Sequence, residues 1–187
     1  MNGQASIFET GFCFLRHGES EANRMGVIAG NLDVALTDRG RAQARSAAPA
    51  LAQAGIARVL ASPMARARET AEIVAAELGL PVETLAGIEE RRWGTLEGRP
   101  LAERPDYFTV VPGAESWEDF RLRCDSALSR VASSGTLIVG HAGTWRAICA
   151  HKGLPPESNA IPNATPIRVA PEGAQPAWTT LSGVARL

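Results

Sequence analysis

FCFLRHG, residues 12–18, is the stretch that decides the fold of this chain. It begins with four apolar residues and continues at once with a polar Arg-His-Gly, which is typical of a buried strand that ends at a site. The same order returns in TLIVGHAG, residues 136–143. The sequence therefore predicts two buried strands, one that ends before His17 and one that ends before His141.

A helical pattern follows the first of these strands. Residues 37–55 place Ala and Leu at helical spacing and stop at Gly55. Pro49 lies inside this stretch, where proline either kinks a helix or divides it. We therefore expect one bent helix or two short ones.

A second strand and helix come next along the chain. Residues 56–60 are predicted as a strand, and Ser62-Pro63 then supplies a favoured N-cap and first-turn residue. The helix that begins there is expected to reach about Glu77 and to end at Gly79.

The remaining segments are less regular. Glycine and proline interrupt residues 91–112, which predicts an irregular lid or pocket wall. Further predicted elements are a helix that begins at a capping box on Ser116, a helix over 144–152, and short strands at 165–169 and 178–181.

Strands that alternate with helices predict βαβ units. The expected fold class is a three-layer α/β/α arrangement with a mostly parallel central sheet and helices on both faces. A length of 187 residues with 45% hydrophobic content fits one domain over residues 1–187. Ligands of such sheets bind beyond the carboxyl ends of the strands, so His17 and His141 are expected to converge on one pocket.

Composition excludes several classes of function. The formal net charge of −1 argues against broad attraction to nucleic acid or to an anionic membrane. Three cysteines are too few for a disulfide framework, and metal-ligand spacing is absent. The first residues lack the regions of a signal peptide, and no stretch approaches the length of a membrane span. We expect a cytoplasmic protein that needs no metal or cofactor and binds neither nucleic acid nor membranes.

Basic side chains near the two histidines indicate an anionic ligand. Arg16 and Gly18 flank His17, which sets a guanidinium beside an imidazole on a backbone that a ligand can approach closely. Arg66 falls in the first turn of a predicted helix, where its charge adds to the free N–H groups. The alternative for Arg66 is a solvated residue paired within its own helix, and this is the interpretation we keep for Arg68.

Five stretches of the chain form one series of motifs: LRHGESEAN (15–23), GNLDVALT (30–37), SPMARARETA (62–71), IEERRWGTLEG (88–98) and VGHAG (139–143). They resemble the signature blocks of the histidine phosphatase superfamily, the phosphoglycerate-mutase-like proteins, and follow one another in the family's order. The resemblance spans about residues 12 to 170 and is greatest to the compact phosphatases of the superfamily.

The resemblance implies a catalytic set and no metal. By position, this set is His17 as nucleophile, Arg16 and Arg66 as ligands of the phosphoryl oxygens, Glu90 as proton donor and His141 as a further member of the charged pocket. Asn23 matches a residue that contacts the phosphoryl group, although its amide is equally suited to capping a loop. Glu90 is preferred to Glu89 because the family's carboxylate directly precedes the Arg of a Glu-Arg pair.

These residue types suit phosphoryl transfer. Fixed positive donors stabilise the negative charge on the equatorial oxygens while a nucleophile attacks in line. Two guanidinium groups near His17 are expected to lower the pKa of this imidazole and keep it neutral for attack. A carboxylic acid at Glu90 would assist the departure of an alkoxide, and its carboxylate would then activate water.

The expected activity is hydrolysis of a phosphomonoester through a covalent phosphohistidine on His17. A mutase is the alternative, since a pocket shielded from water can return the phosphoryl group to a second substrate hydroxyl. The mutases of the superfamily carry a much longer insertion between the residues that match Glu90 and His141, so the resemblance favours the phosphatase. A non-catalytic module that binds phosphorylated ligands is less favoured, because nucleophile and acid are both present. The expected partner is a small-molecule phosphate ester, with sugar phosphates, nucleotides, cofactor precursors and phosphoproteins all open.

Overall fold

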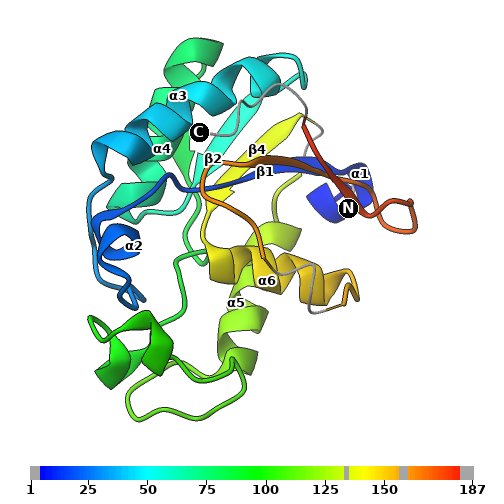
Figure 1. Cartoon of the computed structure of the whole chain (residues 1–187). Helices are drawn as coiled ribbons and strands as arrows, with labels where there is room; N and C mark the ends of the chain where they lie inside the picture. Colours follow the sequence, from blue (N-terminus) through cyan, green and yellow to red (C-terminus); the bar gives the residue numbers. More distant parts are fainter. Residues whose placement is uncertain (1–4, 133–134, 156–159, 182–187) are drawn as a thin grey trace.

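The computed structural model describes residues 5–132, 135–155 and 160–181 of the chain, and Figure 1 shows their arrangement. A six-stranded sheet lies at the centre, in the order β3-β2-β4-β1-β5-β6. Its strands are β1 (Phe12–Arg16), β2 (Arg58–Ala61), β3 (Val82–Thr84), β4 (Thr136–Gly140), β5 (Pro166–Val169) and β6 (Trp178–Thr180). The pairs from β3 to β1 are parallel, whereas β5 is antiparallel to both β1 and β6. The predicted mostly parallel sheet is confirmed.

Helices cover both faces of this sheet (Figure 1). They are α1 (Ile7–Thr10), α2 (Glu21–Met25), α3 (Asp38–Ala52), α4 (Ala65–Leu78), α5 (Trp117–Ser129) and α6 (Ala142–His151), with 3₁₀ turns η1 (Gly94–Leu96) and η2 (Leu101–Glu103). α3 and α4 pack on one face, and α5 and α6 pack on the other. The predicted three-layer α/β/α arrangement is confirmed. Among the residues described, no helix combines the length and the hydropathy needed to cross a bilayer.

The alternation of side chains along β1 explains why both faces need helices. Phe12 and Phe14 belong to the apolar cluster shared with α5 and α6, whereas Cys13 and Leu15 belong to the cluster shared with α3 and α4. Successive side chains of a strand point to opposite faces, and helices cover both faces here, so all four side chains are buried. A strand buried on both faces is an uninterrupted apolar run, which is the pattern that the sequence shows.

Several predicted boundaries are corrected. α3 is one helix, and Pro49 lies in its last turn, where it removes one N–H donor and the helix ends three residues later at Ala52. β2 begins at Arg58 rather than at residue 56, and α4 begins at Ala65 with Met64 as N-cap, so Ser62 does not cap it. α1, α2 and β3 were not predicted, because each is too short to show a repeating pattern of apolar residues.

Candidate active site

Two adjacent strand ends bring the predicted histidines together. β1 and β4 are parallel neighbours, with Arg16 opposite Gly140. The His17 N–H donates to the Gly140 carbonyl at 2.9 Å. The ring centroids of His17 and His141 therefore lie 5.3 Å apart. The two rings thus lie side by side at this edge of the sheet, although only His17 lines the cavity described next.

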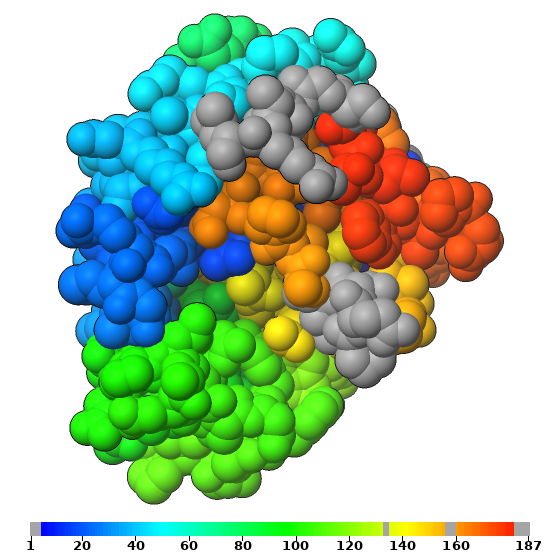
Figure 2. All heavy atoms as spheres, in the orientation of Figure 1, coloured from blue at the N-terminus to red at the C-terminus, as the bar shows by residue number. Residues whose placement is uncertain are grey.

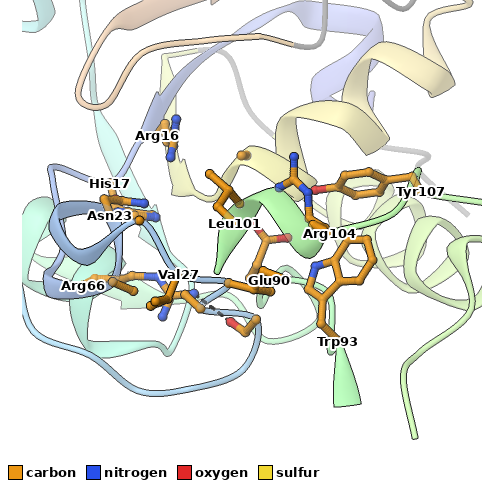
Figure 3. A pocket seen from close by; sticks show the side chains of 16 residues that line it. Arg16, His17, Asn23, Val27, Arg66, Glu90, Trp93, Leu101, Arg104 and Tyr107 are labelled. Atoms are coloured by element: carbon orange, nitrogen blue, oxygen red, sulfur yellow. Dashed lines mark hydrogen bonds between the residues drawn. The ribbon is translucent and has the colours of Figure 1, made fainter. Parts of the chain in front are cut away.

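A cavity of about 120 Å³ opens at this edge of the sheet. Figure 2 shows the face hollowed between the blue segment around α2 and the green segment that carries η1 and η2. Figure 3 shows side chains from both segments facing the cavity. The predicted site residues that line it are Arg16, His17, Asn23, Arg66 and Glu90. His141 is fully buried and does not line the cavity.

His17 is held in one tautomer. Its Nδ1 lies 2.7 Å from the Gly18 carbonyl oxygen, which can only accept, so Nδ1 carries the proton. Nε2 of the neutral ring then keeps its lone pair. Burial, followed by the charges of Arg66 and Arg16, lowers the pKa of His17 well below its ordinary value. The imidazole is therefore neutral at physiological pH, as the sequence analysis expected.

Arg66 is buried and held by backbone carbonyls. Its Nη1 donates to Leu32 O at 2.8 Å and its Nη2 donates to Gly30 O at 2.9 Å. Its Nε has no partner among the described residues. Burial lowers the pKa of Arg66, while the negative charge of Glu90 acts to raise it. The alternative of pairing within the helix is wrong for Arg66, since neutral carbonyls hold the guanidinium and leave its charge available.

Arg16 is oriented in the same way. Its Nη1 donates to the carbonyl of Ile161 at 2.9 Å, and its buried Nε has no partner in the described part of the chain. Burial lowers the pKa of Arg16, and the charge of Glu90 opposes this shift. Two arginines without carboxylate partners thus face His17. Arg68, by contrast, pairs with Glu72 at 2.9 Å on the exposed side of α4, as expected.

His141 and Ser62 form a buried pair that the sequence did not reveal. The Nε2 atom of His141 lies 2.8 Å from the hydroxyl of Ser62, and both side chains are buried. Ser62 Oγ also accepts from the Met64 N–H at 3.4 Å. Burial, and next the charge of Arg66, lowers the pKa of His141 well below its ordinary value. Ser62, expected to cap α4, instead orients the second histidine.

Glu90 lies across the cavity from His17 (Figure 3). Its Oε1 accepts from the Arg91 N–H at 2.8 Å, and its Oε2 accepts from the Gly143 N–H at 3.0 Å. A Cβ on Gly143 would overlap Glu90 Oε1, so only glycine lets the carboxylate lie there. Glu89, the rejected candidate, accepts from Gly87 N at 2.9 Å and pairs with Arg123, outside the cavity lining.

Asn23 combines the two roles considered for it. Its Oδ1 accepts from the Ser20 N–H at 3.2 Å as part of the capping box of α2. The same oxygen accepts from Asn163 Nδ2 at 3.2 Å, and Asn163 also donates to the His17 carbonyl at 2.8 Å. Asn23 nevertheless lines the cavity. Its oxygen is occupied by protein contacts, so only its NH₂ group is left for a ligand.

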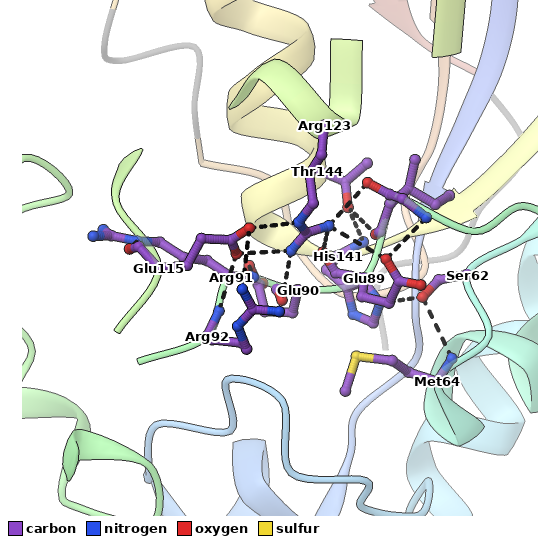
Figure 4. A network of polar contacts seen from close by, with 12 residues as sticks. Ser62, Met64, Glu89, Glu90, Arg91, Arg92, Glu115, Arg123, His141 and Thr144 are labelled. Atoms are coloured by element: carbon purple, nitrogen blue, oxygen red, sulfur yellow. Dashed lines mark hydrogen bonds and ion pairs between the residues drawn. The ribbon is translucent and has the colours of Figure 1, made fainter. Parts of the chain in front are cut away.

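A network of ion pairs fixes the irregular segment that begins at residue 91 (Figure 4). Arg91 is buried, donates to the carbonyls of Glu115 at 2.9 Å and Tyr107 at 2.7 Å, and lies over the Trp93 ring. The buried Glu115 carboxylate accepts from Arg123 at 2.6 Å. These contacts make the segment a wall of the cavity, as predicted.

Arg104 and Tyr107 are site residues that the sequence analysis missed. Both line the cavity, together with Trp93 and Leu101 of the same segment. Burial, followed by the charge of Glu90, raises the pKa of Tyr107 to about 12. Because this segment has no periodic pattern, the sequence did not indicate that Arg104 would face the cavity.

Among the described residues, no group of three or more His, Cys, Asp or Glu could hold a metal ion.

Comparison with known proteins identifies related sequences and structures. A family model described as the histidine phosphatase superfamily (branch 1) matches residues 12–182. The uncharacterized phosphatase PhoE of Bacillus subtilis is 31% identical over 145 residues, which cover 74% of this chain and 75% of PhoE. The putative phosphoserine phosphatase 2 of Hydrogenobacter thermophilus is 33% identical over 150 residues, which cover 72% of this chain and 74% of that protein.

A solved structure extends the likeness to almost the whole chain. The phosphoglycerate mutase of Thermus thermophilus has a TM-score of 0.75 and 26% identity, and the match covers 95% of this chain and 99% of that one. Phosphatases and mutases thus both occur among the similar proteins.

Proposed function

The chain belongs to the histidine phosphatase superfamily, and on that premise we propose that it hydrolyses phosphomonoesters through a phosphohistidine on His17. The observation that carries the proposal is the Nδ1–H contact of His17 with the Gly18 carbonyl, which leaves Nε2 with a free lone pair. Arg16 and Arg66 face the same cavity without carboxylate partners. A neutral nucleophile beside two unpaired guanidinium groups is the arrangement that phosphoryl transfer needs.

In the first step, His17 Nε2 attacks phosphorus and forms the P–N bond while the P–O bond to the leaving group breaks. Glu90 gives its proton to the departing oxygen. Arg16 and Arg66 hold the equatorial oxygens, whose negative charge they stabilise most in the transition state. The NH₂ group of Asn23 is a further donor to these oxygens.

In the second step, water attacks the phosphohistidine and the P–N bond breaks. The Glu90 carboxylate takes the proton of the attacking water, so the enzyme returns to its starting state and inorganic phosphate leaves. No metal takes part in either step.

His141 acts from behind the nucleophile in this proposal. We propose that the Ser62 hydroxyl, which accepts from the Met64 N–H, donates its hydrogen to His141 Nε2. In that arrangement the neutral His141 ring carries its proton on Nδ1, which has no partner among the described residues. Although His141 does not line the cavity of the free protein, its ring centroid lies 5.3 Å from that of His17, so this N–H would donate to a phosphoryl oxygen on His17.

The proposed substrate is a small-molecule phosphate ester, and the proposed unit is one domain over residues 1–187 in the cytoplasm. A phosphoglycerate mutase is the second candidate, because the similar Thermus thermophilus structure is one. Incubation with 3-phosphoglycerate and a trace of the bisphosphate separates the two. We expect phosphate release and little 2-phosphoglycerate, whereas rapid interconversion without hydrolysis of any ester supports the mutase.

The phosphohistidine is tested by trapping it. Acid-sensitive, alkali-stable label should appear on the protein when a ³²P-labelled ester is mixed with it and quenched within milliseconds. His17→Ala should abolish both label and turnover, because imidazole attack begins every route. Arg68→Ala, on the exposed side of α4, is the matched control and should keep both. Turnover in His17→Ala at the wild-type rate would disprove the mechanism, because the reaction would then proceed without the His17 imidazole.

A further inference from the structure

Arg104 and Arg146 lie beyond the phosphoryl site and form no ion pair among the described residues. Many arginines of the chain pair with a carboxylate, as Arg58 does with Glu83 and Arg121 with Glu118, both at 2.7 Å. Other arginines of the described part, such as Arg91 and Arg168, also lack an ion pair but donate to backbone carbonyls. Arg104 and Arg146 differ from these because both lie at the same aromatic ring. Two positive charges at the same place are costly unless an anion joins them.

Tyr107 brings these two guanidinium groups to one place. The Arg146 Cζ lies 4.3 Å from the centroid of the Tyr107 ring, and the Arg104 Cζ lies 5.5 Å from it. Arg104 is also close enough to Arg16 to act on the pKa of Arg16. Arg146 also donates a side-chain hydrogen bond to Tyr107. Stacking on a ring occupies only the flat face of a guanidinium, so the remaining N–H groups of Arg146 and the N–H edge of Arg104 can bind an anion.

A second cavity adjoins the phosphoryl site along this wall. It measures about 500 Å³ and shares Leu101, Arg104 and Tyr107 with the first cavity. Arg146 lines it from α6, and Figure 3 shows Arg104 and Tyr107 at the shared wall. A substrate whose phosphoryl group lies beside His17 can extend along this shared wall from the first cavity, of about 120 Å³, into the second.

One carboxylate, that of Asp106, lies near the two arginines. Asp106 also lines the second cavity. Its carboxylate accepts from the N–H groups of Phe108 at 2.8 Å and Thr109 at 3.0 Å, and from the Thr109 hydroxyl at 3.0 Å. It is therefore committed to its own turn. Glu90 lines the first cavity together with Arg104 but forms no ion pair with it, and no carboxylate of the described residues pairs with Arg104 or Arg146.

We propose that Arg104 and Arg146 bind a second anionic group, a carboxylate or a further phosphate, on the leaving group of the substrate. The proposal rests on the proposed hydrolase function and narrows it from any phosphomonoester to esters whose leaving group is itself negatively charged. A bidentate contact from a guanidinium suits either anion. Phe108 and Trp117 supply an apolar surface in the same cavity for the carbon frame between the two groups.

Matched substrate pairs test this inference. 3-Phosphoglycerate and glycerol 3-phosphate differ only in a carboxylate against a hydroxymethyl group, and adenosine 3′,5′-bisphosphate and adenosine 5′-monophosphate differ in a second phosphate. We expect kcat/KM to be about tenfold or more higher for the charged member of at least one pair, mainly through KM. The pair that shows the preference identifies which anion the site accepts.

Variants then assign the preference to residues. The measured quantity is the ratio of kcat/KM for the substrate with the second anionic group to kcat/KM for the substrate without it. Arg104→Gln and Arg146→Gln should each bring this ratio close to one, whereas Arg68→Gln should leave it at the wild-type value. If the two arginines only hold Tyr107 in place, each variant lowers turnover of all esters alike and the ratio stays, which overturns the inference. Thermal melting identifies any variant that fails to fold, and the wild-type ratio is decisive without variants.

p-Nitrophenyl phosphate, which carries no anionic group besides its phosphate, separates failure of the anionic leaving-group site from failure of the hydrolase. Turnover of p-nitrophenyl phosphate without preference in either substrate pair refutes the anionic leaving-group site and leaves the hydrolase intact. Absence of turnover with every ester refutes the hydrolase itself, and the inference fails with it.

Discussion

Individual protonation states decide whether His17 can work as a nucleophile. Its Nδ1 contact with Gly18 selects the tautomer, and burial together with Arg66 and Arg16 keeps the ring neutral. The arginines proposed to bind the phosphoryl group therefore also keep the proposed nucleophile in its neutral form. A single set of charges serves substrate binding and activation.

The state of His17 can be measured directly. We expect the imidazole signals of His17 in NMR spectra of the free protein to show no titration near pH 6.5. Arg66→Met should raise the pKa of His17 toward that value, since Arg66 exerts the largest effect of any charge on it. Arg68→Met, in the same helix but ion-paired at the surface, is the control. A His17 signal that titrates near pH 6.5 in the wild-type protein would contradict this account.

At the scale of elements, the first turn of α6 and the segment after Glu90 position the proposed acid. The Gly143 N–H holds Glu90, and a Cβ at residue 143 would occupy the space of the carboxylate. Arg66 depends in a similar way on the loop at residues 30–32. The Glu97 Oε1 atom accepts from Asn31 N and from Trp93 N, both at 2.9 Å, and so joins this loop to the cavity wall.

Gly143→Ala tests whether Gly143 positions the Glu90 carboxyl group. The added methyl should displace Glu90 and lower turnover of alkyl phosphates about 100-fold or more, the typical size of a general-acid contribution. Esters with good leaving groups, such as p-nitrophenyl phosphate, should lose much less, because p-nitrophenolate departs without a proton. Glu90→Gln should show the same contrast. Equal losses for both ester types in both variants would remove Glu90 from the acid role.

Glu97 tests the positioning of Arg66. Glu97→Ala leaves the Asn31 and Trp93 N–H groups without their acceptor, so the loop that holds Arg66 should loosen. We expect affinity for vanadate to fall about tenfold, or about 1.4 kcal/mol, and KM to rise more than kcat falls. Glu97→Gln keeps an oxygen acceptor and should largely restore both values. If Glu97→Gln binds vanadate as weakly as Glu97→Ala, the carboxylate's charge rather than its acceptor oxygen is responsible.

Across the whole molecule, the two buried histidines make stability depend on pH. Both have folded-state pKa values well below 6.5, whereas the unfolded chain binds their protons near pH 6.5. Below pH 6.5 the unfolded state therefore holds more protons than the folded state, and the free energy of unfolding decreases as pH falls. Above that pH the two states hold equal numbers of these protons, and this source of pH dependence vanishes.

Urea unfolding between pH 7.5 and 5.5 measures this effect. Each histidine should contribute up to about 1.4 kcal/mol per pH unit below pH 6.5. His141→Asn should reduce the slope by about one histidine's share, and His17→Asn should do the same. Identical slopes in wild type and both variants would show that the buried histidines take up protons in the folded state.

The sequence by itself determined the layers of the fold and the residues at the strand ends. Apolar runs such as residues 12–15, followed at once by polar Arg-His-Gly, are typical of strands buried on both faces, and parallel pairing then brings His17 and His141 to one edge. These are consequences of local pattern and of a small set of allowed topologies. Tertiary structure alone decided how Ser62 meets His141 and where Arg104 lies. Such contacts join residues far apart in the chain or in segments without periodicity, so they follow from packing rather than from any local preference of the sequence.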